Sequence, residues 1–312
     1  MPLPKHEKLL NQIVEQIEQR LNEFSSGIGS VEKSVYDRIL ALASKLEVKG
    51  GKITQSIQNI NLIKDLSVEL QRMILSPAYM NHVEEFVKAF EIVQSLQNSY
   101  FSALAVDFKP KKLLAALKND AVNYTIDKLT DQGVSSLVAS EAEAILRQNI
   151  TQGGSISDLI DQMKQFIRGG VDANGNKIPG RLTRYASQIT TDSLNQFSAN
   201  YNEAATADLG WKWRMYTGSL LETSREWCVY MVKKKYVHES ELQTVIQDHI
   251  DGVQICSQLI PCSKKTGLPK GMIEGTNASN IGQRRGGWQC GHQFGGVPDA
   301  VVPQHLRSKF KS

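Results

Sequence analysis

Long apolar runs are absent from this 312-residue chain. No stretch approaches the roughly 18 apolar residues that a membrane-spanning helix requires. The N-terminus, Met1–His6, also lacks the apolar core of a secretory signal peptide. We therefore expect no membrane span, and synthesis and folding in a cytoplasm. The hydrophobic fraction of 41% and the charged fraction of 22% are ordinary for a globular protein, and the length suits two domains.

Cysteine is absent from the first two thirds of the chain. All four cysteines, Cys228, Cys256, Cys262 and Cys290, lie in the last third. In a reducing compartment, clustered cysteines with histidines nearby indicate a metal site or reactive thiols before they indicate disulfides. Disulfides stay open as an alternative, because a protein that leaves the cell inside a particle can still oxidise.

Common catalytic signatures are absent as well. The sequence has no Gly-rich phosphate loop, no paired-carboxylate motif and no HExxH. One interpretation as an enzyme remains, with Cys228 or Cys290 as nucleophile and His292 as base. The members of a Cys-x-His pair share a face, however, and do not easily reach the in-line geometry that this chemistry needs. We expect a protein that is not an enzyme, with a Cys/His-dependent enzyme as the alternative.

Charge is unevenly distributed along the chain. Residues 1–180 contain 20 Lys and Arg against 21 Asp and Glu, whereas residues 181–312 contain 16 against 11. The positive excess allows contact with nucleic acid or with an acidic protein surface, although a solvated basic face explains it more simply. Arg225, Arg284 and Arg285 are the candidate contacts for a phosphate or a nucleic-acid backbone.

Apolar residues recur at steps of three and four through most of the first 170 residues, which predicts amphipathic helices. The expected helices are 5–24, 30–48, 54–75, 78–105, 110–130, 135–151 and 155–167. The run Ser25–Ser30 is expected to end the first helix, with Ser30 as the N-cap of the second. In the third helix, the residues expected to face inward are Ile57, Ile60, Ile63, Leu66, Leu70 and Ile74. Residues 1–170 are thus predicted to form a helical bundle or array, whose apolar stripes pack on each other or on a partner.

The run 171–180 is rich in Asn and Gly and marks a linker or loop. Another helix is expected at 181–209, and the alternation in Trp211–Thr217 is the first strand signal. A short strand or turn at 231–237, a short helix at 239–250 and a loop at 252–285 with few buried residues follow. The chain is therefore predicted to be mainly α in its N-terminal region, followed by a small α+β domain over 181–312.

The stretch Gly286–Phe294 concentrates unusual residues. Its glycines allow close approach, Trp288 and Phe294 can anchor it, and Cys290 and His292 share a face because strand side chains alternate. Cys228 and His238 can join them only through the fold. These four residues, Cys228, His238, Cys290 and His292, would form a closed tetrahedral site for structural zinc.

The cysteines also allow interpretations without a metal. Cys228 and Cys290 could form a disulfide, or could pack as small apolar side chains. Cys256 and Cys262 are alternative or additional thiols. One geometric prediction holds for a metal site and for a disulfide alike: Cys228 lies near Cys290 and His292 in the fold.

Five motifs follow one another in the last third of the chain. They are Tyr201–Ala204, Trp211-x-Trp213, Glu222–Cys228 with its Arg225, Lys235–His238, and Gly286–Pro298 with its Cys290-x-His292. In this order they resemble the C-terminal domain of the phage head morphogenesis, or minor capsid, proteins named after the F protein of phage Mu. The resemblance covers about residues 185–303. Glu222 stands where the family usually has Asp, and Gly291 where it often has Arg.

The resemblance implies a virion protein present in a few copies in the head or at the portal vertex, assembled in the host cytoplasm. It implies portal, capsid or scaffold proteins as partners, several copies around the portal, and a role in head assembly, with packaging or delivery of DNA as a further role. A DNA-binding protein carried in the virion is an alternative. The N-terminal helices would dock on helical surfaces of these partners.

Overall fold

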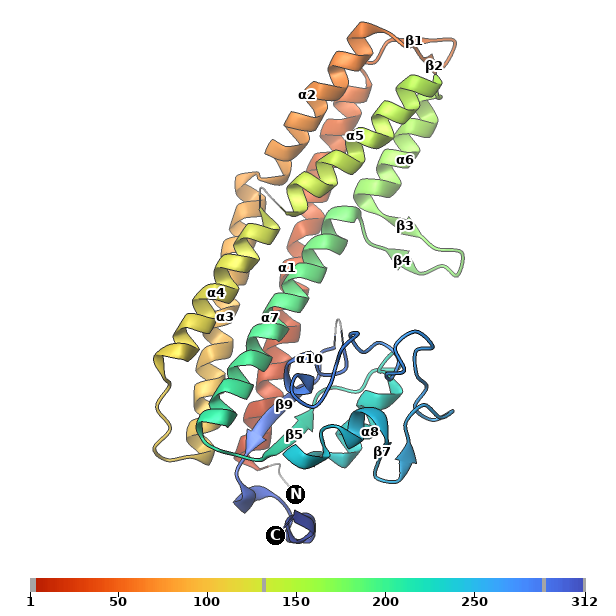
Figure 1. Ribbon diagram of the computed structural model, residues 1–312. Helices are drawn as coiled ribbons and strands as arrows, with labels where there is room; N and C mark the ends of the chain where they lie inside the picture. Colours follow the sequence, from red (N-terminus) through yellow and green to blue (C-terminus); the bar gives the residue numbers. More distant parts are fainter. Residues whose placement is uncertain (1–3, 131–132, 288–289, 311–312) are drawn as a thin grey trace. The chain divides into compact units, whose positions relative to one another are not determined.

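The structure is a computed structural model that describes residues 4–130, 133–287 and 290–310 (Figure 1). About 63% of it is helical, and a small region with short antiparallel strands follows the N-terminal helices, which confirms the predicted fold class. Within the described residues, no helix contains a stretch long and apolar enough to cross a bilayer.

The chain divides into two compact units. We call residues 20–88 and 123–190 the helical unit, and residues 1–19, 89–122 and 191–312 the mixed unit. This division differs from the sequential one expected, in which residues 171–180 separate two domains. The reason is that four helices each supply residues to both units. They are α1 (Lys5–Ala43), α3 (Pro77–Leu104), α4 (Lys112–Leu129) and α7 (Arg181–Asp208).

The helical unit also contains helices and hairpins of its own. They are α2 (Ile57–Ile74), α5 (Val134–Gln152), α6 (Ile156–Arg168), the hairpin of β1 (Val48–Lys49) and β2 (Lys52–Ile53), and the hairpin of β3 (Gly170–Val171) and β4 (Lys177–Ile178). α5 packs against both α2 and α6. Most of the linker or loop expected at 171–180 belongs to the β3–β4 hairpin. Its turn is held by the Asp172 carboxylate, which accepts hydrogen bonds from the amides of Asn174 and Asn176.

Helix α1 runs without a break through Ser25–Ser30, where the sequence predicted an end, so that prediction was wrong. The hydroxyl of Ser30 donates to the carbonyl of Gly27 inside the helix, at 2.8 Å, and caps nothing. A Cβ at Gly27 would lie 2.5 Å from the ring of His82. The glycine is therefore explained by close packing against α3 rather than by helix termination.

Helix α2 agrees with the prediction in its later turns, where Ile63, Leu70 and Ile74 are buried, but not at its start. Its N-cap is Ser56, and the first two residues expected inside are exposed, Ile57 by 80% and Ile60 by 43%. Asn59 takes the inward place: its amide nitrogen donates to the carbonyls of Glu47 and Thr54, at 3.0 and 2.8 Å. A buried polar anchor, which hydrophobic periodicity does not reveal, thus sets the orientation of this helix.

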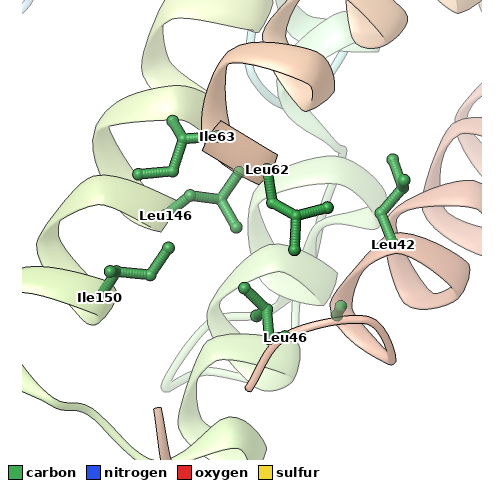
Figure 2. Close-up of a pocket in the computed structure, with 7 residues that line it drawn as sticks. Leu42, Leu46, Leu62, Ile63, Leu146 and Ile150 are labelled. Atoms are coloured by element: carbon green, nitrogen blue, oxygen red, sulfur yellow. The ribbon is translucent and has the colours of Figure 1, made fainter. Parts of the chain in front are cut away.

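A small cleft in the helical unit is lined only by apolar side chains. Figure 2 shows six of them, Leu42, Leu46, Leu62, Ile63, Leu146 and Ile150. The cleft holds about 10 Å³, which is at the lower limit for a single water molecule. It offers no polar group to a ligand, and we interpret it as a gap in the packing.

The mixed unit is built around a three-stranded antiparallel sheet in the order β6-β5-β9. The strands are β5 (Trp213–Thr217), β6 (Tyr236–His238) and β9 (Gln293–Val297). The strand predicted at Trp211–Thr217 is thus confirmed as β5. The strand or turn expected at 231–237 is partly wrong, because the residues up to Lys234 belong to helix α8 (Glu226–Lys234). Short elements complete the unit: α9 (Thr244–Gln247), β7 (His249–Ile250), β8 (Val253–Gln254), α10 (Ile281–Arg284) and α11 (Gln304–Arg307).

The long segment 252–285 contributes to the core, although few buried residues were expected there. Ile255, Ile260, Leu268, Met272 and Ile281 are buried together with Trp227 and Phe294. These apolar residues are separated by turns and follow neither a helical nor a strand period, so pattern analysis did not reveal them.

Strand β9 is an edge strand whose outer side is covered by α3 and α7. The Tyr100 hydroxyl donates to the carbonyl of Gly296 at 2.9 Å, and the amide of Gly296 donates to Asn202 at 2.9 Å. A Cβ on Gly295 would lie 2.6 Å from Leu10. Buried side chains therefore satisfy the backbone groups of Gly296 that a second neighbouring strand would otherwise use.

Candidate metal centre

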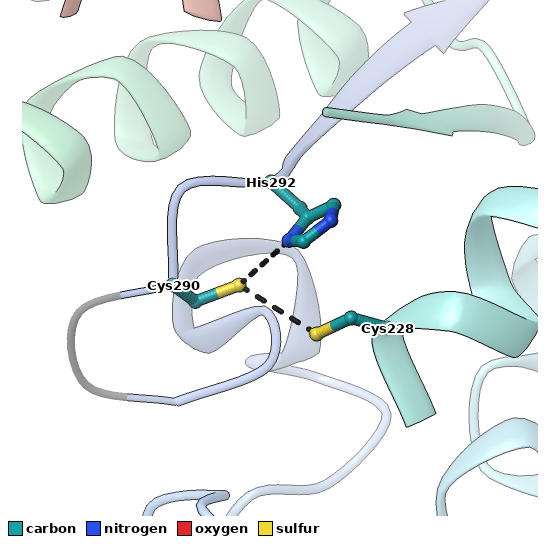
Figure 3. Close-up of side chains that lie close together, drawn as sticks. All are labelled: Cys228, Cys290 and His292. Carbon is teal, nitrogen blue, oxygen red and sulfur yellow. Dashed lines mark hydrogen bonds between the residues drawn. The ribbon is translucent and has the colours of Figure 1, made fainter. Parts of the chain in front are cut away.

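Three chemically reactive side chains meet at one end of the sheet. Cys228 lies in the first turn of α8, whereas Cys290 and His292 lie in the segment that enters β9. Strand β9 pairs with β5 so that Gln293 faces Thr217, which brings His292 beside Gly218. Figure 3 shows the three side chains converging from these two segments, and we call Cys228, Cys290 and His292 the Cys/His cluster.

The cluster is tight and buried. The two sulfur atoms are 3.9 Å apart, and Nδ1 of His292 is 3.7 Å from Sγ of Cys290. All three ligand atoms lie within 4.8 Å of one another, so the group could hold a metal ion. Cys228, Cys290 and His292 are only 1%, 3% and 6% exposed. Both cysteines are free thiols. The prediction that Cys228 lies near Cys290 and His292 is confirmed.

Gly286 provides the space for the two sulfur atoms. A Cβ at this position would lie 2.5 Å from Sγ of Cys228 and 3.0 Å from Sγ of Cys290. Real Cβ atoms do not approach a neighbour that closely, so any larger residue must displace the cysteines. The close packing of the two sulfur atoms therefore explains the glycine at this position. It agrees with the expectation that the glycines of this stretch allow close approach.

Tyr216 on β5 completes the surroundings of the cluster. Its hydroxyl donates to Sγ of Cys228 at 3.4 Å and lies 3.7 Å from Sγ of Cys290. Its ring stacks on the imidazole of His292, with an interplanar angle of 6°. The sequence pattern placed this tyrosine only in a strand, and nothing in the pattern indicated its contact with the cysteines.

The pKa values of the two thiols are shifted in opposite directions. The pKa of the Cys290 thiol is well below its ordinary value, first because Cys228 donates a hydrogen bond to it and then because of His292 and the Arg285 cation, against the effect of burial. The pKa of the Cys228 thiol is raised, first by the same hydrogen bond to Cys290 and then by burial. A metal ion would bind both sulfur atoms as thiolates and release their protons.

A cavity of about 270 Å³ opens beside the cluster. It is lined by Glu18, Ser219, Leu221, Thr223, Ser224, Arg225, Cys228, Cys290, Gly291 and His292. One carboxylate and one guanidinium therefore face the same space as the three ligands. Glu18 comes from α1, more than 200 residues away in sequence, and no sequence signal connected it with the cysteines.

Comparison of the chain with protein-family models, with curated proteins and with solved structures found no match in any of the three.

His238 does not belong to the cluster, so its inclusion among four ligands is corrected. It pairs with Trp213 at the far end of β5, four residues along the strand from Thr217, which is about 13 Å. Its Nδ1 hydrogen-bonds with the hydroxyl of Ser240 at 2.8 Å, and its ring stacks on Phe310. Among the described residues, no fourth Cys, His, Asp or Glu joins the three.

The three candidate arginines have different surroundings. Arg225 lines the cavity and donates to the carbonyl of Gly286 at 2.9 Å. Arg284 donates to a carbonyl of the preceding loop. Arg285 is only 5% exposed and donates to the carbonyl of Asn195 at 2.7 Å, so it cannot belong to a basic surface patch. Its expected role in phosphate or DNA contact is therefore wrong.

The remaining predicted residues are placed as follows. Cys256 and Cys262 form a disulfide in the 252–285 segment and take no part in the cluster. Phe294 is buried and contacts Tyr216, as expected of an anchor. Trp288, the other expected anchor, lies outside the described residues.

Proposed function

We propose that this chain is a minor head protein of a tailed phage that acts in head assembly at the portal vertex. The observation that carries the proposal is the ordered set of motifs described above, in which the Arg225–Cys228 turn and the Cys290-x-His292 segment come from distant parts of the sequence. All five motifs belong to the mixed unit, and two of them supply the Cys/His cluster. The proposal requires the five motifs to lie in one compact domain, and their common place in the mixed unit supports it.

An exposed apolar stripe on α2 supports docking on a helical partner. Ile57, Ile60 and Val68 are separated by three and eight residues, which places them on one helix face, and all three are exposed. Such a face fits a groove between helices of a portal, capsid or scaffold protein. In this proposal several copies surround the portal inside the virion.

The decisive experiment uses particles from the phage that encodes the chain. Quantitative mass spectrometry of purified heads should find the protein at a few copies per particle, and it should co-purify with the portal protein. Ile57→Asp with Ile60→Asp should abolish co-purification, whereas the same exchange at exposed Val106 should not. Absence of the protein both from mature heads and from assembly intermediates would exclude this function.

A Cys/His-dependent enzyme is the second candidate, and the cavity beside the cluster is the observation that favours it. On this alternative, His292→Ala would abolish turnover of a substrate while the mixed unit stays folded. DNA contact has weaker support, because the burial of Arg285 removes one of its three candidate residues. DNA binding that weakens as salt is added would support DNA contact as a function.

A further inference from the structure

We propose that the Cys/His cluster binds one Zn²⁺ ion through three protein ligands, and that the fourth coordination position opens into the adjacent cavity. Water occupies this position at rest, and a small oxyanion with a single charge, such as a carboxylate, can replace it. This proposal does not depend on the role in phage assembly.

The spacing of the ligand atoms fits a tetrahedral ion. Zinc–sulfur and zinc–nitrogen bonds at a tetrahedral angle place two sulfur atoms about 3.8 Å apart and a sulfur and a nitrogen about 3.6 Å apart. The corresponding distances here are 3.9 Å and 3.7 Å. A disulfide would need the sulfur atoms at about 2.05 Å. Two of the three ligand pairs thus already have the spacing that zinc would impose, and all three ligand atoms lie within 4.8 Å of one another.

The polar groups around the cluster support a bound cation. The Tyr216 hydroxyl donates to Sγ of Cys228, as a neighbour that stabilises a bound thiolate would. Two thiolates and an imidazole bind zinc in preference to harder divalent ions, which favour oxygen ligands.

The fourth position has no protein ligand within the part of the chain that the structure describes. All three residues line the cavity of about 270 Å³, which is large compared with the roughly 10–15 Å³ that a cavity needs to hold one water molecule. Three protein ligands with an open position are typical of zinc sites that bind water or substrate, whereas structural sites are closed by four.

The charges around the cavity define the class of ligand. Arg225 carries a guanidinium held by the carbonyl of Gly286, and it can pair with an anionic oxygen. Glu18 faces the same cavity, and its Oε1 would lie 3.6 Å from a Cβ on Gly291. Its carboxylate can accept a hydrogen bond from zinc-bound water but repels an anion, so a single charge is favoured over a dianion.

The test begins with the metal itself. Full-length protein purified under reducing conditions should contain about one zinc per chain by elemental analysis. Cys290→Ser and His292→Ala should lose it, whereas His238→Ala should retain it. Wild-type protein that binds zinc well below this stoichiometry, in elemental analysis and in direct titration, would overturn the metal centre whether or not the variants fold.

The open position is tested with Co²⁺ in place of zinc and acetate as the probe. Acetate should change the visible absorption spectrum of the Co²⁺ protein in a saturable way. Arg225→Gln should weaken acetate binding about tenfold or more, and Glu18→Gln should strengthen it severalfold. A spectrum that does not respond to acetate would show a closed site and refute the proposal. Equal acetate affinity in both variants and wild type would refute the assigned charges.

Discussion

Replacing Gly286 by alanine should disrupt the Cys/His cluster specifically. The new Cβ would lie 2.5 Å from Sγ of Cys228, and ordinary contact begins at 3.4 Å, so the sulfur atom must move by about 0.9 Å. Metal–ligand distances tolerate only about 0.2 Å, so such a shift should weaken zinc binding by at least tenfold. Overpacking should also lower the free energy of unfolding by about 1–3 kcal/mol.

Gly291→Ala is the matched control for this substitution. It lies five residues away in the same segment, and its added Cβ would meet Glu18 at 3.6 Å, which is an ordinary contact. Both exchanges reduce the entropy of the unfolded chain similarly, so the difference between them isolates the steric effect. Urea unfolding followed by far-UV circular dichroism, with and without zinc, measures both quantities. Equal stability and equal zinc affinity of the two variants would show that the sulfur atoms do not lie as described.

Three further predictions concern stability. Tyr100→Phe leaves the buried carbonyl of Gly296 in β9 without its donor and should lower the free energy of unfolding by about 1–3 kcal/mol. Tyr124→Phe, at an exposed site, is the control and should change this free energy by less than about 0.5 kcal/mol. Urea unfolding measures both values. Burial raises the pKa of the Glu32 carboxyl above 4.5, so the folded state binds its proton more tightly than the unfolded chain does. The free energy of unfolding of the wild type should therefore fall, relative to that of Glu32→Gln, as the pH rises from about 4.5 through the raised pKa. Parallel plots of this free energy against pH for the two proteins would contradict the prediction. The double exchange Cys256→Ala and Cys262→Ala should cost about 2 kcal/mol and leave zinc stoichiometry unchanged, and a loss of zinc would contradict the separation of the disulfide from the cluster.

Local patterns predicted the elements whose residues face a continuous core. The helices of the first 170 residues and strand β5 follow directly from apolar spacing. Errors arose where a contact distant in sequence overrides a local signal. Gly27 resembles a helix breaker but packs against His82, and Asn59 displaces Ile57 and Ile60 from the interior of α2.

In the candidate site, too, local patterns were predictive and contacts between residues distant in sequence were not. Cys290 and His292 could be paired from the two-residue spacing, and Cys228 could be assigned to them by its motif. The exclusion of His238 depends on the register of β5 with β6 and β9, which the sequence does not encode locally. Glu18 and Tyr216 reach the cavity and the cluster only through tertiary packing. The three members of the Cys/His cluster were thus predictable from the sequence, but the exclusion of His238 from it was not.

The covering of β9 by Tyr100 and Asn202 restricts how copies of this protein can associate. A strand from another molecule cannot hydrogen-bond to Gly296, because both of its backbone groups are already occupied by buried side chains. Growth of the sheet past this edge, which leads to domain swapping or fibres, would first require these side chains to leave the interior. Close contact between copies of the protein therefore leaves this edge of the sheet protected from cross-β association.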